Sequence, residues 1–281
     1  MKRLHRLARA LVALAMVLVP ATGLLAGAKV TLGRQWPAGQ QLRLDRIDHA
    51  TFDVLLKKYV DPQGLVDYGT WKASPADMQG LDAYIELLSR GDPNRSGSRD
   101  ATMAFWINAY NAVTIRGILR EYPTSSIRNH TARVFGYNIW NDLLLNVGGR
   151  PVSLGQMENE ILRKMGDPRI HFAIVCASIG CPKLRNEAYT PDRLEEQLAK
   201  NAHDFFADSQ KFRYDPAASQ MALSPILQWY ASDFGATAEQ QLATISPYLP
   251  DEAARQAAAR GAARLSFLGY DWGLNDQARR R

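Results

Sequence analysis

The stretch DATMAFWINAYNAVTIRGILREY, residues 100–122, carries the longest apolar helical pattern in the chain. It is apolar nearly all round through Val113, and a helix without a polar face has to be covered by other elements. The sequence therefore predicts a helix at the centre of the domain. Asn108 and Asn111 lie three residues apart on one face of this helix. Buried amides need hydrogen-bond partners, so these side chains either hold the backbone of a neighbouring loop or line a pocket.

Shorter amphipathic patterns surround the central helix. Helices are predicted over residues 44–59, from Ser74, from a capping box at Ser153 to Met165, over residues 190–208, and from Pro225 and Thr237. Strands are predicted in two hairpins, over residues 143–152 and 212–223, and over residues 264–268. These elements predict a single, helix-rich α+β domain over residues 45–276, with the central buried helix packed on a small antiparallel or mixed sheet.

The segment RIHFAIVCASIGCPKLR, residues 169–185, contains both cysteines, Cys176 and Cys181, together with His171. Its apolar run predicts a buried strand over residues 170–176 that leads into a sharp turn. Side chains alternate along a strand, so His171 and Cys176 would lie on opposite faces, about 16 Å apart. This arrangement excludes a direct nucleophile–base pair between them, which needs heavy atoms within about 3.2 Å.

Three states of the two cysteines stay open: a local disulfide, a free reactive Cys181, or two inert buried thiols. A disulfide between Cys176 and Cys181 would close a loop of six residues, and the chain-entropy relation gives about 2 kcal/mol for it. A reactive Cys181 would need a cation or a helix N-terminus to lower its pKa, and Lys183 or Arg185 could supply the charge. An export signal would make the disulfide permissible.

The first 28 residues have the layout of such a signal. Four basic residues precede an apolar run over residues 10–19, Pro20 breaks the run, and Ala26-Gly27-Ala28 supplies small residues at the cleavage spacing. The alternative is an uncleaved membrane anchor, because residues 11–28 are just long enough to span a bilayer. We expect a signal peptide over residues 1–28 that is cleaved near Ala28, a periplasmic or secreted protein, and no membrane span after cleavage.

The basic character of the chain belongs to its ends. The net charge is +6 over 281 residues, and residues 1–28 contain four basic and no acidic residues, which leaves +2. Without the three terminal arginines the remainder carries −1. Residues 29–44 are interpreted as an N-terminal extension and residues 277–281 as a basic tail. A nucleic-acid-binding protein needs a basic face on its folded body, so nucleic acid is not an expected partner.

The histidines and carboxylates give no metal-ligand pattern. Outside the first 28 residues the histidines are His49, His130, His171 and His203, and no two have the i,i+4 spacing of helical ligands. Structural zinc needs four Cys or His ligands. Glu158 and Glu160 are two residues apart on the capped helix and do not share a face. No metal and no cofactor is predicted.

Five blocks of the sequence resemble a known bacterial and plant family. They are FWINAYNAVTI (residues 105–115), MENEILR (157–163), HFAIVCASIGCPKLRNEAY (171–189), LQWYASDFG (227–235) and YDWGLND (270–276). The blocks occur in family order in the "domain of unknown function five-four-seven" family, and the resemblance covers about residues 45–276. It implies a fold and a set of characteristic residues, but no reaction. These residues are Asn108, Tyr110, Asn111, Glu158, His171, Cys176, Cys181, Pro182 and Arg185.

A looser similarity connects the chain to transglutaminase-like and papain-like thiol hydrolases, which pack a central helix on a sheet and place a histidine on a strand. Their nucleophilic cysteine lies at the start of the central helix, where this chain has none.

Two functions follow as hypotheses. In the first, an exported domain binds an unknown small molecule or protein in a pocket near the cysteine turn, at Asn108, Tyr110, Asn111, Cys176 and Arg185. In the second, a thiol-dependent hydrolase or acyltransferase uses Cys181 as nucleophile, with His171 or another histidine as base. Glu158 is then the orienting group and Asn108 the oxyanion donor.

Overall fold

The computed structural model of the chain describes residues 29–95, 97–132 and 136–280. The signal peptide predicted over residues 1–28 lies outside these described residues. Its cleavage and the localisation that would follow therefore stay predictions. The domain boundaries predicted at residues 45 and 276 also stay predictions.

The predicted central helix is present as α4 (Arg99–Glu121). It begins where the Ser98 hydroxyl accepts a hydrogen bond of 3.1 Å from the backbone N–H of Ala101, which satisfies one of the free donors of the first turn. Every residue from Met103 to Ile115 is buried. The helix is therefore the spine of the larger hydrophobic cluster, which extends over residues 44–198 and Leu274.

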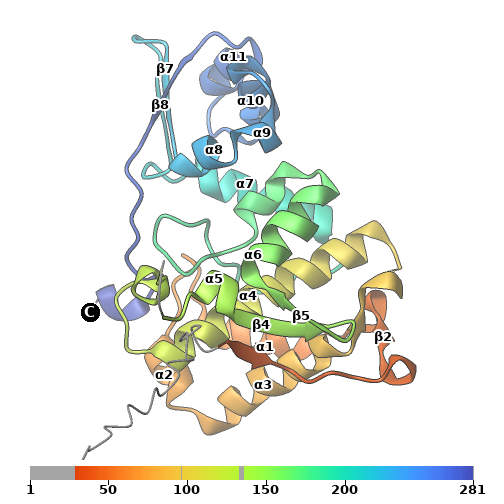
Figure 1. Cartoon of the computed structure of the whole chain (residues 1–281). Coiled ribbons are helices and arrows are strands. Elements are labelled where there is room, and N and C mark those ends of the chain that lie inside the picture. The colour runs from red at the N-terminus through yellow and green to blue at the C-terminus, as the bar shows by residue number, and fades with distance from the viewer. Residues whose placement is uncertain (1–28, 96, 133–135, 281) are drawn as a thin grey trace, which may run out of the picture.

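Three helices pack beside α4 in the N-terminal part of the molecule (Figure 1). They are α1 (Ala50–Tyr59), α2 (Tyr68–Lys72) and α3 (Pro75–Ser89). α3 starts as predicted, with the Ser74 side chain capping the helix and Pro75 in the first turn. Aromatic stacking connects these helices, since the rings of Tyr59 and Trp71 lie 4.6 Å apart.

The strands form small sheets, two of them mixed. β4 (Leu143–Val147) pairs antiparallel with β5 (Arg150–Ser153) and parallel with β1 (Val30–Leu32). β7 (Gln220–Leu223) pairs antiparallel with β6 (Phe212–Asp215) and parallel with β8 (Arg264–Phe267). β2 (Leu42–Arg43) and β3 (Gly91–Asp92) make a short parallel pair. Both predicted hairpins are present, and the helix-rich α+β class with mixed sheets is confirmed.

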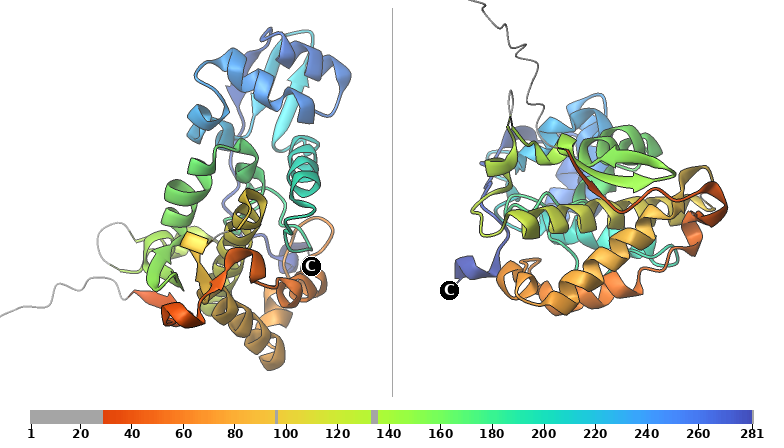
Figure 2. Two further views of the ribbon diagram at one scale, coloured as in Figure 1. Left: turned by 90° about the vertical axis from the view of Figure 1, so that its right-hand side faces the viewer. Right: turned by 60° about the horizontal axis from the view of Figure 1, so that its bottom comes forward.

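A second hydrophobic cluster fills the C-terminal lobe, which we define as residues 208–267 (Figures 1 and 2). The β6–β7–β8 sheet packs there with four short helices, α8 (Pro225–Trp229), α9 (Ala231–Phe234), α10 (Ala238–Ile245) and α11 (Glu252–Ala259). Helix α7 (Leu194–Phe206) connects the two clusters, because Leu198 belongs to the first and Phe205 to the second. The chain after β8 then descends along one side of the molecule to the N-terminal part (Figure 1).

The strand predicted over residues 170–176 is wrong. Pro168–Phe172 is a 3-10 helix whose first turn is capped by the side chain of Asp167, and an irregular segment follows it. The backbone groups of this segment are satisfied by side chains rather than by a neighbouring strand, since Asn111 bonds to both Ala173 and Val175. The alternation argument that placed His171 and Cys176 on opposite faces therefore does not hold.

Candidate functional site

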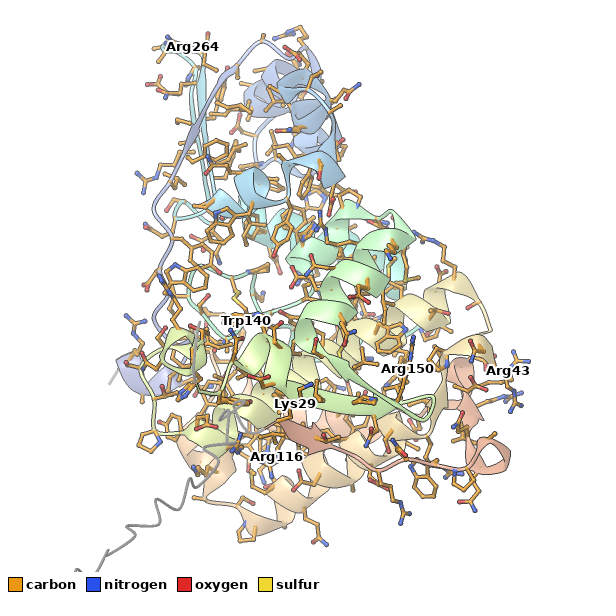
Figure 3. The ribbon with its side chains drawn as sticks, in the orientation of Figure 1. Lys29, Arg43, Arg116, Trp140, Arg150 and Arg264 are labelled. Carbon is orange, nitrogen blue, oxygen red and sulfur yellow. A yellow bond between two sulfur atoms is a disulfide. The ribbon has the colours of Figure 1, made fainter. Side chains whose placement is uncertain are left out.

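A cavity of about 190 Å³ lies where the N-terminal part, the cysteine turn and the C-terminal lobe meet. Its lining residues come from α4, from α5 (Ile139–Asp142), from the segment around the cysteines, from α8 and the residue after it, and from the descending C-terminal segment. They are Tyr110, Trp140, Glu158, His171, Ile174, Cys176, Cys181, Pro182, Ile226, Trp229, Tyr230, Tyr270 and Trp272. Trp140 lies on α5, at the side of the N-terminal part that faces the lobe (Figure 3). The cavity brings together five residues predicted for the site, Tyr110, Glu158, His171, Cys176 and Cys181.

Glu158 is placed by an irregular helix. α6 (Leu154–Gln156) begins at the predicted capping box of Ser153 and Gln156, and the helix then widens into a π-helical turn, Met157–Leu162. π-helical turns are frequent at functional sites. This turn directs Glu158 inward with only 6% of its surface exposed.

The surroundings of Glu158 are mostly neutral. The Tyr110 hydroxyl lies 3.5 Å from its Oε2. Burial raises the pKa of Glu158 above its ordinary value, against the opposing effects of the Tyr230 hydroxyl, Arg163 and Tyr110. A buried carboxyl with a raised pKa beside a cavity is a common property of functional sites.

His171 is held by a carboxylate that sequence analysis did not single out. Its Nε2 lies 2.7 Å from Oδ2 of Asp233, and its ring stacks on Tyr230 at a centroid distance of 4.0 Å. Burial lowers the pKa of His171, against the opposing effect of Asp233. The orienting partner of His171 is thus Asp233, whereas Glu158 contacts tyrosine hydroxyls.

Asp233 is also paired with Arg163. The guanidinium donates from Nε to Oδ2 at 2.6 Å and from Nη2 to Oδ1 at 2.8 Å. The hydrogen bonds from Arg163, and after them the contact with His171, lower the pKa of Asp233 to about 2. The cation nearest to Glu158 in sequence is therefore neutralised by its own bidentate partner.

Both cysteines line the cavity. Their sulfur atoms lie at disulfide distance from each other. The Tyr270 hydroxyl lies 3.2 Å from Sγ of Cys181 and 2.9 Å from the Ser178 hydroxyl. Between the cysteines, Ala177 has a left-handed backbone with φ of 58°, a conformation rare for residues with a side chain.

The descending C-terminal segment fixes the cysteine turn from outside. Ile179 donates its backbone N–H to Gly273 and Gly180 donates to Asp271, both at 2.8 Å. A Cβ atom at Gly180 would lie 2.8 Å from carbons of the Tyr270 ring. Glycine is therefore required at position 180 because Tyr270 packs directly on the backbone.

The two asparagines of α4 hold loop backbone. Asn108 donates to the Tyr189 carbonyl at 2.8 Å and accepts from the Tyr189 N–H at 2.9 Å. Asn111 makes the same kind of two-sided contact with Ala173 and Val175, at 3.0 and 2.9 Å. Neither residue lines the cavity. Of the two roles left open for them, holding a neighbouring backbone is the one that these contacts show.

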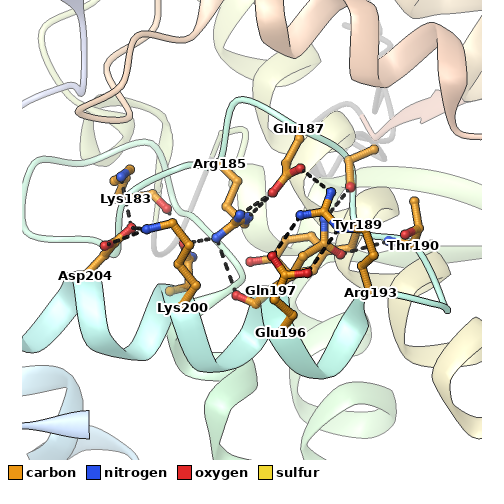
Figure 4. A network of polar contacts seen from close by, with 12 residues as sticks. Lys183, Arg185, Glu187, Tyr189, Thr190, Arg193, Glu196, Gln197, Lys200 and Asp204 are labelled. Atoms are coloured by element: carbon orange, nitrogen blue, oxygen red, sulfur yellow. Dashed lines mark hydrogen bonds and ion pairs between the residues drawn. The ribbon is translucent and has the colours of Figure 1, made fainter.

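Arg185 lies in a separate polar network between the cysteine turn and α7 (Figure 4). Its guanidinium bonds to Glu187 and reaches the side chain of Asn201 at 3.4 Å. Burial alone would raise the pKa of Glu187, but hydrogen bonds from Arg185 and Arg193 hold it at about 2. Arg185 is not a lining residue of the cavity.

A second cavity, of about 470 Å³, lies on the other side of the cysteine turn and shares Cys181 and Pro182 with the first. Its lysines are paired with neighbouring acids, Lys183 with Asp204 at 2.9 Å and Lys211 with Asp208 at 3.2 Å. Lys183 was a candidate for lowering the pKa of Cys181, and its ammonium is engaged by Asp204 instead. Both lysines of this cavity are thus engaged by carboxylates.

Several residues of the site were missed as individual residues by sequence analysis. They are Trp140, Arg163, Trp229, Tyr230, Asp233, Tyr270 and Trp272. All except Trp140 lie in three of the sequence blocks that carry the family resemblance, residues 157–163, 227–235 and 270–276. The family resemblance therefore pointed to these segments, but their spacing along the chain did not show that they meet at one cavity.

The family comparison confirms the resemblance on which part of this site rests. Residues 94–206 match the model of the family described as "Protein of unknown function, DUF547". The matched segment contains α4, Glu158, His171 and both cysteines, whereas Tyr230, Asp233 and Tyr270 lie beyond it. No curated protein and no solved structure matches the chain.

Within residues 29–95, 97–132 and 136–280, no group of three or more His, Cys, Asp or Glu side chains could hold a metal ion. In the same part of the chain, no helix has the length and apolar character needed to cross a bilayer.

Proposed function

We propose that this protein is an exported ligand-binding domain that holds a small molecule in the cavity beside the cysteine turn, with Cys176 and Cys181 joined by a disulfide. The observation that carries the proposal is a buried carboxyl, Glu158, at a cavity whose other walls are mainly aromatic. Small-molecule sites combine apolar and aromatic walls with a few polar groups that orient the ligand. The export signal predicted over residues 1–28 supports the same reading, since an oxidising compartment preserves disulfides.

The rim of the cavity supports binding rather than simple core packing. Trp229 lines the cavity and is 48% exposed, although large apolar side chains are usually covered. Its ring stacks with Trp272 at a centroid distance of 5.7 Å and lies 4.9 Å from Tyr270. This aromatic cluster offers a preformed surface that a ligand would cover.

The binding test uses the tryptophans as reporters, because three of the six in the chain line the cavity. We would titrate the protein with choline, 3,3-dimethylbutan-1-ol, glucose and hexanoate and follow the intrinsic fluorescence. At least one probe should saturate with a millimolar or tighter Kd, as expected for ligands of about ten non-hydrogen atoms. Trp229→Ala should weaken that binding, whereas Trp36→Ala, which removes a tryptophan outside the cavity, should not. If no probe saturates, the ligand-binding proposal fails.

A thiol-dependent hydrolase or acyltransferase is the second candidate. The observation that favours it is that His171, which is paired with Asp233, lines the same cavity as both cysteines. It requires reduced cysteines, since a thiolate is the nucleophile. A thiol count on denatured, unreduced protein purified from the periplasm separates the candidates. Zero free thiols support the disulfide, and two free thiols, one of them labelled rapidly at neutral pH, support the hydrolase.

A further inference from the structure

The charge balance of the cavity is uneven. Among the thirteen lining residues there is one carboxyl, Glu158, and no lysine or arginine. His171 is held by Asp233 through Nε2, and its pKa is lowered by burial, which favours the neutral ring at neutral pH. Arg163 directs two guanidinium nitrogens to Asp233 and is not a lining residue. A negative ligand would therefore meet no free cation on the described walls, whereas a positive one would meet a carboxylate.

The buried carboxyl has neutral hydrogen-bond partners and no cation of its own. The Tyr110 hydroxyl lies 3.5 Å from it, and the Tyr230 hydroxyl is its second partner, whereas Arg163 is engaged by Asp233. Burying a carboxylate is unfavourable unless it is paired, and burial accordingly raises the pKa of Glu158. A cation held in the cavity would supply the missing pairing.

The remaining walls suit the apolar part of such a cation. Trp140, Trp229 and Trp272 line the cavity together with three tyrosines. Ring faces attract cations through their quadrupole, tryptophan most strongly, and the attraction increases when the cation is desolvated. A carboxylate surrounded by rings therefore distinguishes an alkylated ammonium ion from a neutral molecule of the same shape.

We propose that the cavity binds a small organic ammonium ion, with its charge at Glu158 and its alkyl groups against the tryptophan and tyrosine rings. This inference rests on the proposed function and specifies the chemical class of its ligand.

The experiment compares two probes of nearly identical shape, choline and 3,3-dimethylbutan-1-ol, which has a carbon in place of the quaternary nitrogen. Titration calorimetry on residues 29–281 measures the affinity for both probes. The wild-type protein should bind choline at least tenfold more tightly than the neutral alcohol. Glu158→Gln should strongly reduce this preference, leaving only the part due to the rings, and should keep the binding of the alcohol within about twofold, because the shape of the side chain is kept.

Glu160→Gln is the matched control, since Glu160 lies on the same helical turn but is exposed. It should keep the wild-type preference for choline. Thermal unfolding of both variants shows whether each is folded. Equal affinity for the two probes, tighter binding of the alcohol, or choline binding that Glu158→Gln leaves unchanged would overturn the ammonium assignment while the pocket stands. If neither probe binds and glucose and hexanoate do not bind either, the proposed ligand-binding function falls with it.

Discussion

Two groups of buried polar side chains lie within the same part of this molecule and differ in how completely they are paired. The amides of Asn108 and Asn111 each donate to and accept from loop backbone at 2.8 to 3.0 Å. Glu158, only 6% exposed, has only tyrosine hydroxyls as hydrogen-bond partners, those of Tyr230 and, at 3.5 Å, Tyr110, and it faces a cavity. In the sequence both groups are polar residues within predicted helices. The difference shows that complete pairing identifies the structural group, whereas incomplete pairing beside a cavity identifies the candidate for binding.

The largest loss of stability should come from removing the paired hydrogen bonds of Asn111. Asn111→Ala leaves the Ala173 carbonyl and the Val175 N–H buried without their partner. Each unpaired group costs about 1–3 kcal/mol, so the free energy of unfolding should fall by roughly 2–4 kcal/mol. Urea denaturation followed by circular dichroism measures the loss. Asn159→Ala removes an exposed helical asparagine and should change stability by less than about 0.5 kcal/mol. A similarly small loss for Asn111→Ala would show that its contacts do not hold the loop.

The next largest loss of stability should come from opening the proposed disulfide in the cysteine turn. Reduction of the proposed disulfide, or replacement of both Cys176 and Cys181 by alanine, releases a six-residue loop in the unfolded chain. The expected loss is about 2 kcal/mol, measured by urea denaturation with and without reductant. The double alanine variant is the control, because reductant should not change its stability. Equal stability of the wild-type protein in both conditions would contradict the disulfide.

Elements whose contacts are local in sequence were predicted, whereas an element held by a remote residue was not. The central helix, the capping box at Ser153 and the hairpin over residues 143–152 depend on neighbouring residues, and all three are present. The strand predicted over residues 170–176 failed because its backbone partner is Asn111, about sixty residues away, and because Asp167 caps a 3-10 helix.

The same distinction between local and remote partners applies to the site. Glu158, His171 and the cysteines could be named from the sequence, since they lie in blocks that resemble a family. Asp233 could not be assigned to His171, because the contact joins residues 62 positions apart across two hydrophobic clusters. Tyr270 likewise reaches Cys181 from 89 positions away. Spacing along the chain carries no information about such contacts.

Replacing Glu158 should have a smaller effect on stability, and its sign should be opposite, a gain instead of a loss. Because burial raises the pKa of Glu158, the folded state binds its proton more tightly than the unfolded state does. Ionised Glu158 therefore lowers stability as pH rises above its ordinary pKa. Glu158→Gln should therefore increase the free energy of unfolding at pH 7, and the gain should disappear below about pH 4.5, the ordinary value. Urea denaturation at pH 4 and pH 7 measures it, with Glu160→Gln as the control that shows no gain. A loss of stability at pH 7 would mean that the carboxylate is better paired than its contacts indicate.

The smallest expected effect is the pH dependence of ligand affinity. The groups that face Glu158 are Tyr110 from α4, Tyr230 and Asp233 from the C-terminal lobe, Arg163 from its own helix, and Tyr270 from the descending segment. Burial raises the pKa of each of these tyrosines, and Asp233 stays ionised with its pKa at about 2. Glu158, with its raised pKa, and, beyond the tyrosines, His171, with its lowered pKa, are therefore the groups whose protonation governs the pH dependence of ligand affinity. An ammonium ion binds to the ionised carboxylate, so choline affinity should rise with pH and level off above the raised pKa of Glu158. Loss of any proton from His171 acts in the same direction.

Calorimetry in buffers of different ionisation enthalpy should detect a proton released on binding near the midpoint in the wild-type protein. Glu158→Gln should release little or none, and an affinity independent of pH in the wild-type protein would remove Glu158 from the binding site.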